Sequence, residues 1–556
     1  MFGITELDEL IIQKLERTDV ARGARVCRKW HQIISPYLWH DLSCLRRLSD
    51  AQKQAFARLV EEDYLCQQRH QALQEQHHPT EHYPQTSTLP TLSPLAKYGP
   101  WIQVLPPPGP LLLLFQPTPD PSQLQQAIDL MLHLYKRCIN IQIGRLELET
   151  RNLQSDEFMK AITECLLPHA HELFLCGSSF LESWRFKYIL DRCSDTLEKL
   201  IINIAIKYDE EERGKEHSLE GSKPFVGLKR LNLVFANDKS GSKALWPWLW
   251  RRCTEVEEIT IIGVNDIVQS LVEGMHTYMP KLNRIHIRAG LLNDTMTAAL
   301  LSTCQRGWKE IDLDMTGTKK EALVKHCPTL EKLTMDASVR FSSGDIVQVL
   351  SSSPNLHTLC YTEGIYWGTK IPCIDASSFV DRDSSTDTLK PWKCEASLRI
   401  LKILILGIPR SDLQGRHVPE THLGQGRAIQ GQVYDRLARL TNMETLWLGP
   451  QSKKVTQFDC VEMSLESGLW KLAGLTALQE LSVQGMAARI GVKEVEWMAG
   501  NWPRLRAIYG LKQEGGDGAA VEWLLRHCPE IKLELRFPLS QVRWPAKTGP
   551  SGKGEE

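Results

Sequence analysis

A short spacing of apolar residues recurs along most of this chain, and its clearest copy lies within residues 326–335. There, two variable residues separate Leu330 from Leu333, and one separates Leu333 from Met335. This spacing predicts a short strand, because alternate side chains of a strand face the same side. The first apolar position recurs at Ile143, Ala170, Leu197, Leu228, Val256, Leu282, Trp308, Leu330, Leu356, Leu398, Met443, Leu478, Leu505 and Ile531.

The distance between copies indicates a repeat architecture. Successive copies start 22 to 31 residues apart, with longer steps of 42, 45 and 35 residues after Leu356, Leu398 and Met443. A period of roughly 20 to 50 residues is typical of solenoids, in which each repeat is one structural unit. The longer steps predict two insertions, near residues 362–397 and 407–432.

Amphipathic segments between the copies predict helices, at residues 265–278, 293–304, 344–352 and 517–527. One strand and one helix cannot bury an apolar face alone, but stacked neighbours form a continuous core. We therefore predict an α/β solenoid over residues 126–540, with parallel strands on the concave side and helices on the convex side.

Cysteine or proline stands just before many copies of the spacing. The cysteines are Cys193, Cys253, Cys304, Cys327 and Cys528, and the prolines are Pro280, Pro328, Pro354, Pro503 and Pro529. With this placement, the chain resembles the cysteine-containing leucine-rich repeats over about residues 126–537. The resemblance implies the same solenoid fold.

Composition argues against several classes of function. The 66 Lys and Arg residues nearly balance the 67 Asp and Glu residues, so we expect no nucleic-acid partner. The 15 cysteines include no CxxC pair, and we expect them to be reduced thiols that fill the turns before the strands. The acidic N-terminus is unlike a secretory signal, and the longest apolar run, residues 111–115, is too short for a membrane span. We expect a soluble protein of the cytoplasm, the nucleus or both.

Residues 1–45 predict a separate helical unit. Leu7, Ile11 and Leu15 repeat at helical spacing, and a second helical pattern ends before Pro36. So small a unit buries little apolar surface and leaves large apolar side chains exposed. Such exposure indicates a surface for a partner.

The same segment resembles the F-box motif. The resemblance lies in Val26-Cys27-Arg28-Lys29-Trp30 and in the spacing from Leu15 through Asp19 to that run. At the start of the segment, Gly3-Ile4 stands where the family usually has Leu-Pro, and Asp8 stands where an apolar residue is common. The family's helices dock on the Skp adaptor of cullin-RING ubiquitin ligases. The resemblance therefore implies adaptor contacts by Leu7, Leu10, Ile11, Leu15, Val20, Val26, Trp30, Ile33, Leu38 and Trp39. A helical cap that closes the first repeat is the alternative.

Two segments connect this unit to the solenoid. Residues 46–76 predict a connecting helix that packs beside the first repeat. Residues 77–125 are rich in Pro, His and Gln and predict a flexible linker. Within the linker, a stray first strand at residues 101–105 is an open alternative. At the other end of the chain, residues 541–556 predict a flexible tail.

No motif indicates catalysis or a cofactor. Gly424-Gln425-Gly426 lacks the preceding strand that a dinucleotide-binding loop requires, and we predict a plain loop there. His169 and His171 lie two residues apart, but further metal ligands are missing nearby in sequence. We therefore predict a chain that is not an enzyme, with no catalytic residue, no metal site and no cofactor.

Strand geometry predicts which residues face the concave side. If Leu330, Leu333 and Met335 face the core, Lys332 and Thr334 face away from it, and the same offsets apply in every repeat. These offsets select Arg230, Arg284, His286, Arg288, Glu310, Asp312, Asp314, Trp447 and Tyr509 as candidate substrate-binding residues. The charged residues suit a partner of alternating charge, and the aromatic residues suit apolar anchors. Mutual screening of neighbouring charges is the alternative.

The combination of an F-box-like unit with such repeats is similar to the F-box/leucine-rich-repeat proteins. The resemblance implies the substrate-recognition subunit of an SCF-type E3 ubiquitin ligase. The F-box would dock on the Skp adaptor, and the repeats would hold a protein substrate that other subunits ubiquitinate for proteasomal degradation. Two alternatives stay open: a repeat scaffold without a ubiquitin role, and a receptor of the same architecture that a small molecule gates.

Overall fold

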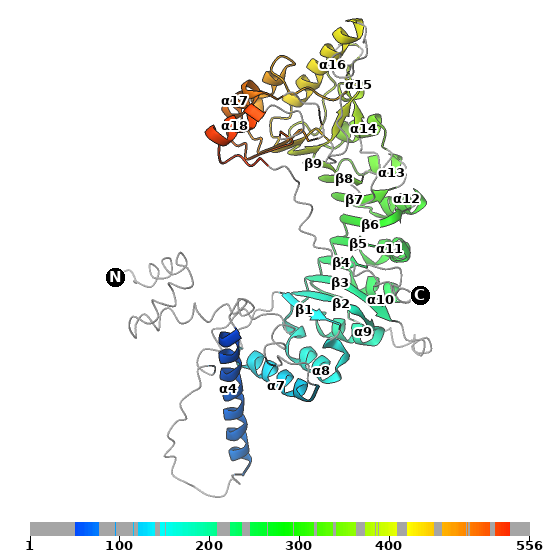
Figure 1. The fold of residues 1–556 in the computed structure, drawn as a ribbon. Coiled ribbons are helices and arrows are strands. Elements are labelled where there is room, and N and C mark those ends of the chain that lie inside the picture. The colour runs from blue at the N-terminus through cyan, green and yellow to red at the C-terminus, as the bar shows by residue number, and fades with distance from the viewer. Residues whose placement is uncertain are drawn as a thin grey trace, which may run out of the picture. The chain divides into compact units, whose positions relative to one another are not determined.

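The computed structural model describes residues 50–76, 95, 115, 121–138, 145–150, 152–207, 223–235, 245–263, 265–292, 294–315, 320–336, 341–362, 373–383, 385–386, 388–408, 420–449, 459–484, 486, 490–511 and 518–533. The chain divides into two compact units, Met1–Leu282 and Asn283–Glu556. Each unit contains its own parallel strands and its own helices (Figure 1).

In the first unit, two helices precede a run of parallel strands. The strands pair in chain order, and α9, α10 and α11 lie on one side of them (Figure 1). The elements are α4 (Asp50–Gln76), α7 (Pro121–Arg137), β1 (Arg145–Glu149), α8 (Asp156–Cys165), β2 (Glu172–Glu182), α9 (Ser183–Arg192), β3 (Lys199–Lys207), β4 (Arg230–Val234), α10 (Leu245–Arg252), β5 (Glu258–Ile262) and α11 (Asn265–Tyr278), with short 3-10 turns at Asn152–Gln154 and Leu167–His169.

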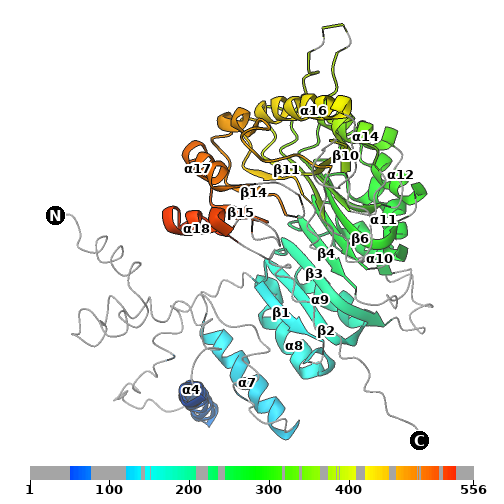
Figure 2. The same ribbon diagram turned by 45° about the horizontal axis from the view of Figure 1, so that its top comes forward.

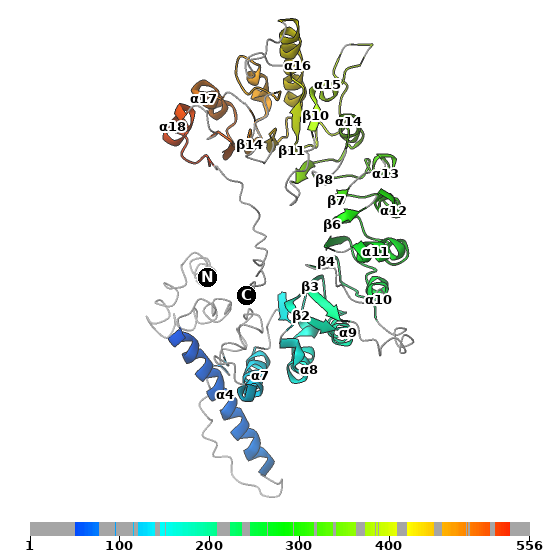
Figure 3. The same cartoon turned by 45° about the vertical axis from the view of Figure 1, so that its right-hand side comes forward.

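The second unit repeats this alternation. The elements are β6 (Arg284–Leu292), α12 (Asp294–Thr303), β7 (Glu310–Met315), α13 (Lys320–Val324), β8 (Lys332–Asp336), α14 (Ser343–Ser352), β9 (Thr358–Thr362), β10 (Cys373–Asp375), α15 (Ala376–Phe379), β11 (Ile400–Lys402), β12 (Leu404–Leu406), α16 (Glu420–Ala438), β13 (Thr445–Trp447), β14 (Glu480–Ser482), α17 (Val492–Asn501), β15 (Ala507–Tyr509) and α18 (Gly518–His527), with a 3-10 turn at Leu469–Gly474. Its long ladder runs β6-β7-β8-β9-β11-β13-β14-β15, and Figure 3 shows α12, α13 and α14 on the outer, convex side of these strands.

Strands and helices alternate in both units, and 13 strands belong to this parallel arrangement. The predicted solenoid-like α/β architecture is therefore confirmed. The apolar spacing also places the strands correctly: β8 begins two residues after Leu330, and Leu330, Leu333 and Met335 are all buried. Within the described residues, which end at position 533, the last copy, at Ile531, contributes a bridge between Lys532 and Ala507.

The predicted helices between the copies are also present. The segment predicted at residues 265–278 is α11, and those predicted at 293–304, 344–352 and 517–527 are α12, α14 and α18, each displaced by one residue at one or both ends. Helix α14 shows why one such helix starts where it does. The Ser342 hydroxyl accepts a hydrogen bond from the Asp345 amide, and the Asp345 carboxylate accepts one from the Ser342 amide, so the two residues form a capping box.

Within each unit, most neighbouring strands are joined by a shared carbonyl just before the strand. The Lys309 carbonyl accepts hydrogen bonds from the Glu331 and Lys332 amides, at 2.8 and 3.0 Å. The Glu331 carbonyl in turn accepts from the His357 and Thr358 amides, at 2.9 and 3.3 Å. This contact, which we call the rung, fixes each strand in register with the next.

Two of the cysteines before the strands, Cys193 and Cys253, cap the preceding helices. Cys193 and Cys253 are buried, and their thiols donate to the carbonyls of Ile189 and Leu249, four residues earlier, at 3.4 and 3.2 Å. Burial raises the pKa of Cys193 to about 12, so its thiol stays protonated near neutral pH.

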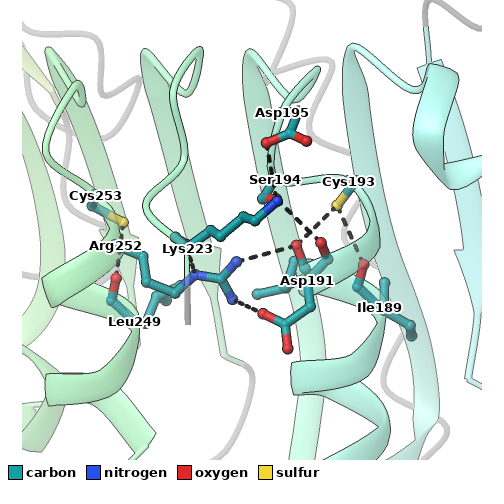
Figure 4. A network of polar contacts seen from close by, with 10 residues as sticks. Ile189, Asp191, Cys193, Ser194, Asp195, Lys223, Leu249, Arg252 and Cys253 are labelled. Carbon is teal, nitrogen blue, oxygen red and sulfur yellow. Dashed lines mark hydrogen bonds and ion pairs between the residues drawn. The ribbon is translucent and has the colours of Figure 1, made fainter. Parts of the chain in front are cut away.

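A buried arginine joins helices α9 and α10 in the first unit (Figure 4). The guanidinium of Arg252 pairs with Asp191 at 2.6 Å and donates to the Lys223 and Leu190 carbonyls, at 2.7 and 3.5 Å. It also lies over the ring of Phe225, 4.3 Å from the centroid. These contacts satisfy a charge that would otherwise be costly to bury.

The second unit uses the same device at Arg436 of α16. Its buried guanidinium pairs with Glu395 at 3.1 Å, donates to the Lys390 and Asp381 carbonyls, and lies 4.7 Å from the centroid of the Trp392 ring. All four partners belong to the first predicted insertion. The arginine therefore ties that insertion to the repeat helix.

The first insertion is partly ordered structure. From Cys373 onward it forms β10 and α15, and β10 pairs in parallel with β12 and contacts α15. Figure 2 shows β10 next to α14. The buried rings of Phe379 and Trp392 meet edge to face at 5.0 Å, giving the insertion a small core. The rung continues past it, because the His357 carbonyl accepts from the Arg399 and Ile400 amides.

The prediction for the second insertion needs a correction. Much of residues 407–432 belongs to α16, and Gly424-Gln425-Gly426 lies inside this helix rather than in a loop. Farther along α16, Val433, Tyr434 and Leu437 are buried, at the spacing of one helix face. Because of the two glycines, the sequence predicts a loop where the structure has a repeat helix of 19 residues.

The connecting helix is present, and the predicted linker ends earlier than expected. Helix α4 covers most of residues 46–76, and α7 begins at Pro121, inside the stretch assigned to the linker. The two helices pack together through Asp63 of α4, whose carboxylate pairs with His133 at 2.6 Å and with Arg137 at 2.8 Å of α7. The proposed strand at 101–105 and the tail at 541–556 lie outside the described residues.

Candidate binding surface

In eight strands of the second unit, the side chains that point away from the helices form two rows on the concave face. The residues that begin the strands form the first row, and those two positions later form the second. The second row, in strand order, is His286, Asp312, Thr334, Cys360, Lys402, Trp447, Ser482 and Tyr509. Parallel strands lie about 4.8 Å apart, so neighbours in a row are within side-chain reach.

Glu310 is the centre of the charged end of this surface. One of its carboxylate oxygens lies 3.0 Å from Arg284, and the other lies 3.4 Å from Lys332. The three residues start β6, β7 and β8, which are paired in register. One carboxylate therefore links three consecutive strands.

Asp312 forms the second charged centre. Arg288 lies 3.2 Å from its carboxylate, and His286 lies 3.6 Å from it. Burial opposes ionisation of this carboxyl group, but the hydrogen bond from His286 and the charge of Arg288 outweigh it, so the pKa of Asp312 lies below its ordinary value. The group is an anion at neutral pH.

The predicted basic and acidic residues thus meet as ion pairs. Arg284, His286 and Arg288 on β6 face Glu310 and Asp312 on β7. Asp314 lies on β7, but its side chain is outside the described set. Partly exposed pairs of this kind contribute little to stability, so the network leaves open both mutual screening and recognition of a partner.

The aromatic residues selected as apolar anchors, Trp447 and Tyr509, lie together at the other end of the surface. Trp447 is only 7% exposed. The ammonium nitrogen of Lys402 lies 3.1 Å from the centroid of its ring, and the Tyr509 ring meets it edge to face at 6.0 Å. Burial lowers the pKa of Lys402. Trp447 is therefore covered by its neighbours, while Lys402 and Tyr509 keep partial exposure.

Two further observations concern the selected residues. Arg230 is exposed and begins β4, in the first unit. It is therefore not part of the charged network, which lies on strands of the second unit. Lys402 was missed, although the same offset finds it: it stands four residues after Leu398, as Trp447 does after Met443. The four-residue offset was present in the sequence, but it was overlooked in this repeat, which lies beside an insertion.

Within the described part of the chain, no group of three or more His, Cys, Asp and Glu side chains could hold a metal ion. His171 instead faces Glu198, at 3.4 Å. Every helix in the described ranges is too short or too polar to cross a membrane.

The predicted adaptor-binding residues all lie outside the described residues. They are Leu7, Leu10, Ile11, Leu15, Val20, Val26, Trp30, Ile33, Leu38 and Trp39. A family model described as F-box-like matches residues 5–45, which include every one of them. The N-terminal segment is therefore F-box-like.

Other comparisons add little. No curated protein matches the chain. Among solved structures, a chain in the crystal structure of the Rad7 and Elc1 complex in yeast is similar, with 11% identity over 74% of this chain and 83% of that chain. The TM-score of 0.38 is too low for this likeness to support a functional argument.

Proposed function

We propose that this chain is a non-catalytic substrate receptor of an SCF-type E3 ubiquitin ligase, in the manner of F-box/leucine-rich-repeat proteins. The F-box-like match at residues 5–45 carries the proposal. The parallel strand arrays downstream supply an extended surface of the kind on which repeat proteins bind partners. The protein would act in the cytoplasm, the nucleus or both.

The proposed mechanism is proximity. The N-terminal segment docks on a Skp-type adaptor, and the repeats hold a protein substrate close to the ubiquitin-conjugating subunit. Tethering raises the effective concentration of the substrate lysine without any new chemistry in this chain. The receptor therefore needs no catalytic residue of its own.

The adaptor interaction is tested by co-purification. Full-length chain carrying Leu15→Ala and Trp30→Ala should lose adaptor binding at least about tenfold, because buried aromatic anchors dominate such interfaces. A matched control replaces two exposed residues of the second unit, Trp470→Ala and Leu525→Ala, and should bind normally. Undiminished binding by the N-terminal double variant would exclude an F-box role and favour a scaffold without ubiquitin function.

The substrate interaction is tested on the charged network. Reversing Arg284 and Arg288 to Glu should weaken substrate capture while adaptor binding persists, because the reversal places like charges against Glu310 and Asp312. A charge swap, Glu310→Arg with Arg284→Glu and Lys332→Glu, keeps both ion pairs of residue 310 and separates folding from recognition. If capture survives both the reversal and the loss of Trp447, recognition lies elsewhere on the chain. If capture needs an added small molecule, the gated receptor applies.

A further inference from the structure

Lys402 differs from the other basic residues on the long ladder of the second unit. Arg284, Arg288 and Lys332 each lie within 3.4 Å of a carboxylate oxygen. Lys402, on β11, forms no ion pair with any described residue, and its ammonium group rests on the face of Trp447. Among the described residues, this cation on the binding surface therefore has no carboxylate within ion-pair distance.

The surroundings of Lys402 make this arrangement costly. Its side chain is mostly covered, and burial lowers its pKa because a desolvated ammonium group is less stable. The Trp447 ring offsets part of the cost through a cation–π contact. Two neighbours oppose the lowering of this pKa, Cys360 in the same row and Glu480 at the start of β14, and neither forms an ion pair with Lys402. Burial raises the pKa of the Cys360 thiol, so it stays neutral near pH 7. The ammonium group therefore retains the capacity to bind an anion.

The neighbouring row provides an apolar contact at a defined spacing. In the second row, Lys402 is followed by Trp447, Ser482 and Tyr509, one residue on each strand. Ser482 is small and buried, and the rings of Trp447 and Tyr509 meet across it. The Lys402 ammonium nitrogen lies 3.1 Å and the Tyr509 ring centroid 6.0 Å from the centroid of the Trp447 ring. The two groups are therefore at most about 9 Å apart, which is the length of about two to three residues of extended chain.

We propose that Lys402, Trp447 and Tyr509 form a recognition site for an acidic side chain, a carboxylate or a phosphate, on an extended segment of the partner protein. The segment would place its anionic oxygens on the Lys402 ammonium group and an apolar side chain against Tyr509, about two to three residues away. This inference rests on the proposed function, because it names the class of substrate that the repeats capture. Charge complementarity selects this occupant, because Lys402 is held in place by Trp447 and forms no ion pair within the described part of the chain.

Degenerate peptide libraries on immobilised full-length chain test the site. One position is fixed as Glu, phosphoserine, Gln or Ser, and the recovery of each pool is measured. Pools with an acidic fixed residue should be enriched about tenfold over their neutral counterparts, the range expected for a charge-assisted hydrogen bond. Comparing the Glu and phosphoserine pools distinguishes a carboxylate from a phosphate.

Three variants make the result specific. Lys402→Met keeps the apolar stem on Trp447 and should abolish the preference, whereas Lys402→Arg should retain it. Lys309→Met removes a lysine that is paired with Glu331 and lies outside the two rows, and it should change nothing. Unchanged melting temperatures show that each variant folds.

Several outcomes would overturn the inference. They are the absence of acidic preference in the natural chain, the same preference in Lys402→Met, or full competition by free inorganic phosphate or acetate at peptide concentrations, which would indicate a small-anion site. Adaptor co-purification is measured on the same preparations. Adaptor binding without acidic preference would contradict this inference alone, and acidic preference without adaptor binding would contradict the proposed ligase role alone.

Discussion

The guanidinium of Arg252 lies 2.6 Å from the Asp191 carboxylate and joins α10 to α9 from a buried position. The carboxylate is about half exposed, whereas the guanidinium is almost completely covered. Arg252 therefore depends on its contacts for charge compensation, while Asp191 keeps access to water. Replacing Arg252 should therefore lower the stability of α9 and α10 more than replacing Asp191 does.

Replacing Arg252 by Met should lower the free energy of local unfolding around α9 and α10 by about 2 to 4 kcal/mol, because two carbonyl groups lose a buried donor. Hydrogen exchange measured by mass spectrometry on the two helices reports this change. Arg251→Met is the matched control, since Arg251 is exposed, and it should cost less than about 1 kcal/mol. Equal effects of the two substitutions would contradict the structural role of Arg252.

Asp312 should contribute stability that disappears in strong acid. Its pKa is lower in the folded chain than in the unfolded chain, so the contribution is complete above about pH 4 and is lost as the pH falls through the folded-state value. The melting temperature of Asp312→Asn should lie below that of the natural chain at pH 6, and the difference should shrink toward pH 2. A constant difference over this range would argue against the ionised carboxylate as the source.

The α4–α7 contact should weaken at mildly acid pH. Burial lowers the pKa of His133, and the hydrogen bond to Asp63 only partly offsets this, while Lys136 and Arg137 lower it further. The contribution of neutral His133 is therefore complete above about pH 6.5 and declines below it. His133→Gln keeps a donor toward Asp63 but does not titrate. Between pH 7 and pH 5, the natural chain should lose more α4 protection against hydrogen exchange, after correction for the intrinsic rate, than this variant.

Gly424→Ala tests the helical assignment of α16. Open space surrounds the position where a Cβ atom would be added, so alanine fits there. In a helix interior this substitution should stabilise the helix by up to about 1 kcal/mol, since glycine loses more backbone entropy. Slower hydrogen exchange in α16 is the expected result. Faster exchange would favour the loop that the sequence suggested.

The repeat could be predicted from sequence because its signal is local. Leu330, Leu333 and Met335 alternate as a half-buried strand must, and the register of β8 follows from their positions. The same offset placed Arg284 and Glu310 on one face, where they form an ion pair. The face on which each strand residue lies, and the order of the strands, can therefore be predicted without knowing contacts between distant segments.

The details that failed depend on contacts between distant segments. The offset rule gives the side on which Trp447 lies, but not that Lys402 of another strand covers its ring. Charged residues on repeat helices are expected to face water, yet Arg252 and Arg436 point inward to meet carbonyl groups distant in sequence. Gly424-Gln425-Gly426 suggested a loop because glycine weakens helices, and tertiary packing of α16 overrode that preference.

The rungs described above also determine how the second unit should respond to mechanical force. Consecutive strands are joined one to the next, as when the Glu331 carbonyl holds the His357 and Thr358 amides. Tension that peels strands from the β15 end would therefore act on one rung at a time rather than on the whole ladder at once. In an optical trap, we expect a series of small extension steps, each releasing about one repeat. Larger steps are expected where the segments between His357 and Arg399 and between Arg399 and Glu444 unravel, because more chain separates these rungs.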